Sequence, residues 1–61
     1  MKLTDLERHL RRHGCILKRQ GGNHTIWENP ATGDWSSLPR HREVREFLVR
    51  GICRQLGIPG V

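Results

Sequence analysis

The sequence is short of large apolar side chains. Tyrosine is absent, phenylalanine occurs once and tryptophan twice in 61 residues, and apolar residues make up only 34% of the chain. A chain of this length buries only about 60% of the surface that its unfolded state exposes. We therefore expect residues 1–61 to form one domain with a small core, which a partner covering part of its surface would stabilise.

The sequence also lacks any apolar run near the roughly 20 residues that a membrane-spanning helix needs. Its first residues, Met1 to Asp5, lack the apolar stretch of a signal peptide. These features predict a cytoplasmic protein with no membrane partner. The only cysteines, Cys15 and Cys53, form no CxxC pair, so we expect two reduced, partly buried thiols rather than a disulfide.

Positive charge dominates the polar residues. Eleven lysines and arginines stand against six acidic residues, which gives a net charge of +5. Nine of the eleven are arginine, whose planar guanidinium makes forked contacts to phosphate and stacks on bases. The excess favours a nucleic-acid partner. An acidic protein that competes for the same face, and a charge that only keeps the surface solvated, are the alternatives.

Two amphipathic helices are predicted near the ends of the chain. The first begins with a capping box, Thr4-Asp5-Leu6-Glu7, and ends at Gly14. The second covers residues 43–56 and is stopped by Gly57. Its apolar residues recur at steps of three and four and comprise Val44, Phe47, Leu48, Ile52 and Leu56.

Three strand-like runs lie between the helices, at residues 15–20, 24–28 and 34–38. Gly21-Gly22 predicts a hairpin turn between the first two runs, and residues 29–33 are turn-forming throughout. The order helix, three strands, helix predicts an α+β domain. In this fold both helices cover one face of a three-stranded antiparallel sheet, which leaves the other face open to RNA.

The stretch Gly21-Gly22-Asn23-His24 is the leading candidate for a functional site. Glycine adopts backbone angles that other residues resist and lets a ligand approach the main chain closely. The histidine stands at the start of a strand, and imidazole can accept or donate a proton near neutral pH. RNA cleavage without a metal needs such a group, together with positive charge near the phosphate. The alternative is a histidine with no chemical task.

Residues close to His24 in the sequence are candidates for RNA binding. Gly22 and Asn23 form the turn itself. Lys18 and Arg19, on the strand before the turn, are placed to hold the scissile phosphate. An ordinary solvated strand end explains these two cations equally well.

A second basic segment, Arg40-His41-Arg42, follows the third predicted strand. All three residues are candidates for RNA contact. His41 is also a candidate for a second proton-transfer group, although an orienting role at the start of a helix is favoured over a catalytic one.

Two further pairs of residues admit more than one interpretation. His9 and His13 have a spacing that can hold zinc, but no further ligand pair accompanies them, so we expect surface histidines and no metal. Trp27 and Trp35 either stack on bases or stabilise the small sheet as cross-strand partners. Because large apolar residues are so few, at least one of the two is expected to be structural.

Three motifs resemble the HicA family of toxins. They are Gly22-Asn23-His24 in the first hairpin, Pro39-Arg40-His41 after the third strand, and Arg54-Gln55-Leu56-Gly57-Ile58 at the end of the closing helix. The resemblance covers nearly the whole chain. It implies a fold similar to double-stranded RNA-binding domains and the activity of an mRNA interferase that a HicB-type antitoxin neutralises. The family's catalytic histidine corresponds to His24, which here follows Asn23 where serine is commoner.

The sequence thus predicts the toxin of a type II toxin–antitoxin system, an endoribonuclease that cleaves mRNA with His24 and without a metal or other cofactor. Two other classes of function stay open. One is a non-catalytic RNA-binding module, and the other is a protein-binding subunit whose basic face meets an acidic protein. RNA cleavage that disappears on changing His24 alone would separate the nuclease from both.

Overall fold

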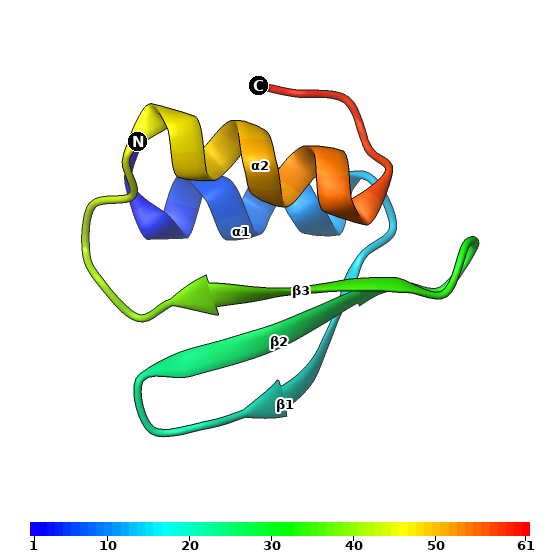
Figure 1. Ribbon diagram of the computed structural model, residues 1–61, viewed down its shortest axis with the longest axis horizontal. Helices are drawn as coiled ribbons and strands as arrows, with labels where there is room; N and C mark the ends of the chain where they lie inside the picture. Colours follow the sequence, from blue (N-terminus) through cyan, green and yellow to red (C-terminus); the bar gives the residue numbers. More distant parts are fainter.

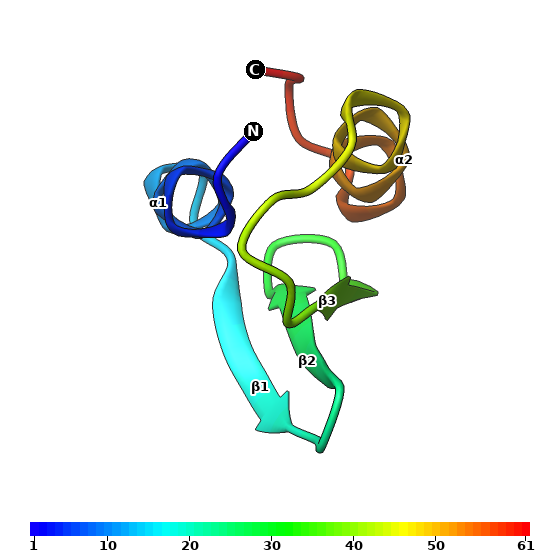
Figure 2. The same cartoon turned by 90° about the vertical axis from the view of Figure 1, so that its left-hand side faces the viewer.

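A computed structural model describes residues 1–61, and it contains the five predicted elements in the predicted order. They are α1 (Leu3–Arg12), β1 (Ile16–Gln20), β2 (His24–Asn29), β3 (Asp34–Pro39) and α2 (Glu46–Leu56). The strands form one antiparallel sheet in the order β1-β2-β3. Both helices lie on the same face of this sheet, side by side (Figures 1 and 2). The predicted α+β fold with one open sheet face is therefore confirmed.

The core lies between the sheet and the helices. Its centre is Trp27 of β2, which is fully buried and donates a hydrogen bond from Nε1 to Thr25 Oγ1 at 3.0 Å. The guanidinium of Arg11 on α1 lies 5.0 Å from the centroid of this indole ring. The buried apolar residues come from every element except β1 and comprise Leu6, Leu10, Cys15, Trp27, Leu38, Val44, Val49, Ile52, Cys53, Leu56 and Ile58.

The first helix begins earlier than the capping box predicts. α1 starts at Leu3, and its N-cap is Lys2, which makes no side-chain capping bond. The predicted capping role of Thr4 and Glu7 is therefore wrong. Lys2 instead pairs with Glu43 in an isolated antiparallel bridge, and Leu3 N donates to Arg42 O at 2.9 Å. This pairing satisfies a free backbone donor at the helix start, which a local capping box would otherwise do.

The second helix begins later than predicted, for the same reason. α2 starts at Glu46 rather than Glu43, because Glu43 pairs with Lys2 and Val44 N donates to Met1 O at 2.8 Å. The contacts with the N-terminal residues therefore keep residues 42–44 out of the helix. The α2 C-terminus is as predicted, with Gly57 in the left-handed region at φ 69°.

The apolar face of α2 is also displaced from the predicted one. The buried residues of the helix are Val49, Ile52, Cys53 and Leu56. Phe47 and Leu48, predicted to be buried, are 60% and 40% exposed. Helical spacing fits both stripes, and contact with the sheet selects the one that includes Cys53, since a thiol packs as a small apolar group.

Both cysteines are free thiols, as predicted, and they are fully rather than partly buried. Burial raises the pKa of the Cys15 thiol. Burial also raises the pKa of the Cys53 thiol, and the nearby Cys15 adds to this effect. Neither helix has the length and apolar content that crossing a bilayer requires.

Candidate functional site

The turn between β1 and β2 is held by a close approach of its own backbone. Gly21 N donates to His24 O at 2.8 Å. A Cβ on Gly21 would lie only 3.1 Å from that same oxygen, so the site has little room for a side chain. Gly22 has open space around it, and neither glycine has a positive φ. The prediction that these glycines supply unusual backbone angles is therefore wrong; what Gly21 provides is close contact.

Arg40 fixes this turn against the end of β3. Its backbone N donates to Asn23 O at 3.1 Å, and its Nη1 donates to Gly21 O at 2.9 Å. Because Arg40 directly follows Pro39, both bonds tie the turn to a residue that the sheet already positions. The remaining guanidinium donors of Arg40 are free to meet a phosphate.

His24 lies at the start of the central strand, where its side chain is exposed. It stands opposite Pro39 in the β2–β3 register. Residues of a strand alternate between faces, and in β2 the buried set is Thr25, Trp27 and Asn29. The imidazole of His24 therefore belongs to the open face of the sheet, beside the Arg40 backbone, where a polynucleotide can reach it.

Positive charge gathers at the same end of the molecule. The β1–β2 turn, the end of β3 and the first residues of both helices all lie at one edge (Figure 1). Helix N-termini carry partial positive charge. A hollow of about 540 Å³ at this edge is lined by Arg40, His41 and Arg42 together with Lys2, Leu3 and Thr4. Lys2 was not among the predicted site residues, because nothing in the sequence connects it with a segment some forty residues later.

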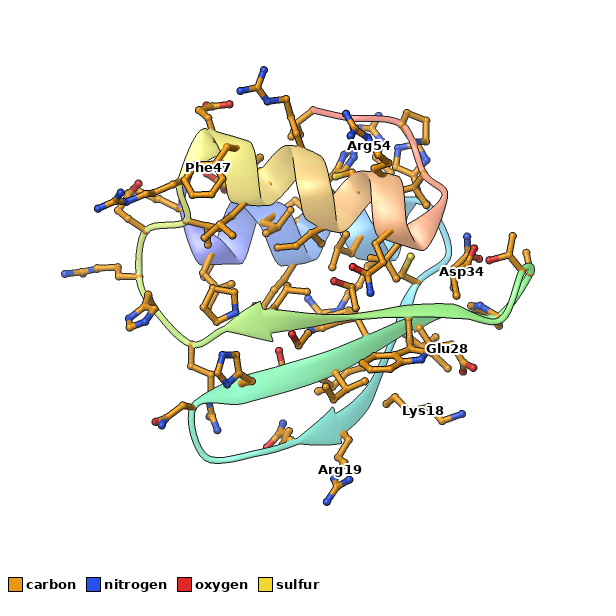
Figure 3. The ribbon with its side chains drawn as sticks, viewed as in Figure 1. Lys18, Arg19, Glu28, Asp34, Phe47 and Arg54 are labelled. Atoms are coloured by element: carbon orange, nitrogen blue, oxygen red, sulfur yellow. The ribbon has the colours of Figure 1, made fainter.

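Lys18 and Arg19 lie on a different part of the open face. Both are on the side of the sheet away from the helices (Figure 3). The β1–β2 register shifts between Leu17 and Arg19, which marks an irregularity at Lys18. Lys18 Nζ forms an ion pair with Glu28 Oε1 at 3.1 Å, whereas Arg19 forms no ion pair. The two predicted cationic groups, at Lys18 and at Arg40, therefore line two separate hollows.

The His9–His13 pair does not form part of a larger cluster. His9 Nε2 lies 2.8 Å from Pro59 O, and the two imidazole rings meet edge to face with centroids 4.6 Å apart. The chain contains no group of three or more histidine, cysteine or acidic side chains that would hold a metal ion.

The two tryptophans have different environments. Trp27 is in the core, and Trp35 is 57% exposed. They are not cross-strand partners, because Trp27 stands opposite Ser36 and Trp35 opposite Glu28. The prediction that at least one tryptophan is structural is thus confirmed for Trp27.

Comparison with known protein families supports the resemblance found in the sequence. A family model described as the HicA toxin of bacterial toxin-antitoxin matches residues 4–58. The chain belongs to the HicA toxin family. Membership of a toxin–antitoxin family implies that an antitoxin is the partner of this HicA protein. Neither the search among curated proteins nor the search among solved structures found a match to the chain.

Proposed function

We propose that this HicA protein is an mRNA interferase, an endoribonuclease whose catalytic group is His24. The observation that carries the proposal is the placement of His24, an exposed imidazole next to a turn that Arg40 fixes through two hydrogen bonds. A catalytic side chain must be accessible to substrate and well positioned. The exposed imidazole is accessible, and the bonds from Arg40 fix the backbone of the turn beside it.

The proposed reaction is attack of an RNA 2′-hydroxyl on the adjacent phosphorus. The 2′-oxygen forms a bond to phosphorus, the bond to the 5′-oxygen breaks, and the strand is cut. One group must take the proton from the 2′-hydroxyl, and another must give a proton to the leaving 5′-oxygen. An imidazole in either role typically contributes about 10²–10⁴ in rate. We assign His24 to one of these two proton transfers.

Charge at the same edge would stabilise the reacting phosphate. Negative charge accumulates on the phosphate oxygens during the attack, and fixed cations stabilise it. Arg40 is the cation that contacts the turn directly, since its backbone and its side chain both donate hydrogen bonds to it. The proposed RNA-binding surface continues along the edge through Gly22, Asn23, His41 and Arg42. It continues across the open face through Lys18 and Arg19.

We further propose that a HicB-type antitoxin neutralises the protein in the cytoplasm. It would cover the basic edge, which is the surface lined by Lys2, Arg40, His41 and Arg42. Two features support the proposal: the net charge of +5, and a core of only 11 buried apolar residues. A partner that presents carboxylates would block RNA and would stabilise the folded domain in proportion to its affinity.

The decisive experiment is His24→Ala, assayed on single-stranded RNA with excess chelator present. We expect cleavage to fall by at least about 10²-fold, while the melting temperature stays unchanged because an exposed side chain leaves no cavity. His13→Ala, which removes another exposed histidine, is the matched control and should cleave normally. His41→Ala tests the second proton-transfer role.

The other outcomes of this experiment identify the alternatives. A folded His24→Ala variant that cuts RNA at the wild-type rate would remove His24 from the mechanism. Wild-type protein that binds RNA but does not cut it is a non-catalytic RNA-binding module. Wild-type protein that binds only an acidic protein is a protein-binding subunit. Loss of wild-type cleavage with chelator would contradict the metal-free chemistry.

A further inference from the structure

Trp35 is a large aromatic side chain that the fold leaves in solvent. It belongs to β3, stands opposite Glu28 of β2, and is 57% exposed. Its backbone is nevertheless well held, because Gln55 Nε2 of α2 donates to Trp35 O at 2.9 Å. The side chain thus projects from a fixed point on the open face and makes no contribution to the core.

A hollow of about 470 Å³ lies against this tryptophan. Trp35 and Ile26 supply its apolar surface, and Lys18, Arg19 and Glu28 supply its charged surface. Its volume is within the range of small-molecule sites, which are typically about 300–1,000 Å³. The side chains of Lys18, Arg19 and Glu28 are labelled in Figure 3.

The chemistry of this hollow suits one nucleobase attached to its phosphate. An aromatic face that stacks on bases, beside cations that follow the backbone, is the common arrangement in proteins that bind single-stranded nucleic acid. Arg19 has no acidic partner, whereas the charge of Lys18 is compensated by Glu28. Arg19 is therefore the cation best placed to meet a phosphate next to the stacked base.

The hollow lies on the same face of the sheet as His24. His24 and Glu28 share the open face of β2, and Trp35 stands opposite Glu28. Four residues along a strand span about 14 Å at about 3.4 Å per residue. A few nucleotides of single-stranded RNA bridge this span, so one strand can place a phosphate at His24 and a base at Trp35.

We propose that Trp35, with Ile26 and Arg19, forms a stacking site for one nucleobase of single-stranded RNA, a few nucleotides from the phosphate at His24. The site rests on the proposed function, in that the ligand is the RNA substrate of the nuclease. It assigns binding of the substrate to the open sheet face, in addition to the basic edge. An antitoxin contact at this face is the competing explanation, and the test separates the two.

The test measures binding of an RNA hexamer that cannot be cleaved because its 2′-oxygens are methylated. Fluorescence anisotropy of a dye-labelled hexamer gives the affinity of the wild type, Trp35→Ala, Trp35→Phe and Phe47→Ala. Phe47 is the matched control, since it is 60% exposed and lies on α2, in the other layer of the fold (Figure 3). Loss of one base–aromatic stack should weaken binding about tenfold in Trp35→Ala. Trp35→Phe should retain most of the affinity, and Phe47→Ala all of it.

A second measurement examines the base itself. A hexamer of the same length whose sugars carry no bases should bind the wild type and Trp35→Ala equally weakly. Intrinsic fluorescence adds a direct signal, because Trp35 is the accessible tryptophan and Trp27 is buried. Binding of the normal hexamer should quench wild-type emission, and Trp35→Ala should lose this quenching.

Each other result overturns the stacking site. If the wild type cleaves RNA and Trp35→Ala binds the hexamer as tightly as the wild type, the stacking site is wrong while the nuclease stands. If Trp35→Ala keeps RNA affinity and loses affinity only for a co-expressed antitoxin, the open face is a protein interface. If the wild type binds no RNA at low salt, both the stacking site and the proposed function fail.

Discussion

The two tryptophans of this chain lie on opposite faces of one sheet, and they differ in burial and in the residues around them. Trp27 is fully buried against the helices and its indole N–H is bonded to Thr25, whereas Trp35 is 57% exposed on the open face. The covered face holds the domain together. The open face packs against no other element, so its residues are available for the RNA binding proposed above. Substitutions on the two faces should therefore separate stability from activity.

Trp27→Ala should lower the free energy of unfolding more than any other single substitution on the covered face. Truncating a buried tryptophan typically costs about 3–5 kcal/mol, and here it also removes the partner of Thr25 Oγ1. Small domains have only about 5–15 kcal/mol of stability in total. Urea denaturation followed by circular dichroism should show a variant that is largely unfolded without a partner. Trp35→Ala is the matched control, and equal loss of stability in both variants would contradict the division between the faces.

Asn29→Ala should give an intermediate effect through a polar contact of the covered face. Asn29 Nδ2 donates to Leu56 O, the last carbonyl of α2, at 2.8 Å, and its Oδ1 accepts from Ala31 N at 3.1 Å. Leaving buried polar groups without partners costs about 1–3 kcal/mol. The change should lower the free energy of unfolding by about this amount and leave RNA affinity unchanged.

Glu28→Gln is the control for Asn29→Ala, since Glu28 is the preceding residue on the other face. It removes the ion pair between Glu28 and the exposed Lys18, and an ion pair at the protein surface contributes only about 0–1 kcal/mol. If Glu28→Gln is as destabilising as Asn29→Ala, burial is not what distinguishes the two sides of β2.

Arg40→Ala should give the smallest change in stability and a clear change in activity. It removes the bond from Nη1 to Gly21 O and keeps the backbone bond to Asn23. We expect less than about 1 kcal/mol of destabilisation, as for one exposed hydrogen bond. Single-turnover cleavage should fall about tenfold or more, because a catalytic group displaced by about 1 Å can lose up to 10²-fold.

Arg42→Ala controls for charge in this experiment. It removes one positive charge from the same segment, and the Arg42 contact with Leu3 uses only its backbone carbonyl. Both variants should lose RNA affinity to a similar extent. Only Arg40→Ala should also show slower single-turnover cleavage once the RNA is bound. Equal rates for the two variants would show that Arg40 acts only as a charge.

The sequence contained enough local information to predict the fold class and most element boundaries. The strands were predicted to within one residue at each end, because turn residues such as Gly21 and Gly33 delimit them. The starts of both helices were predicted wrongly by local rules, since they depend on the pairing of Lys2 with Glu43, and this contact joins opposite ends of the chain.

The candidate histidine was likewise evident from the sequence, because a motif of adjacent residues contains it. The sequence alone determined the order of the elements, the excess of positive charge and the position of His24 at the start of a strand. Only the tertiary structure decided which stripe of α2 is buried, which tryptophan is exposed, and that Arg40 holds the turn. The physical reason is that each of these depends on contacts between segments distant in sequence, and side-chain periodicity records which residues share a face but not what covers that face.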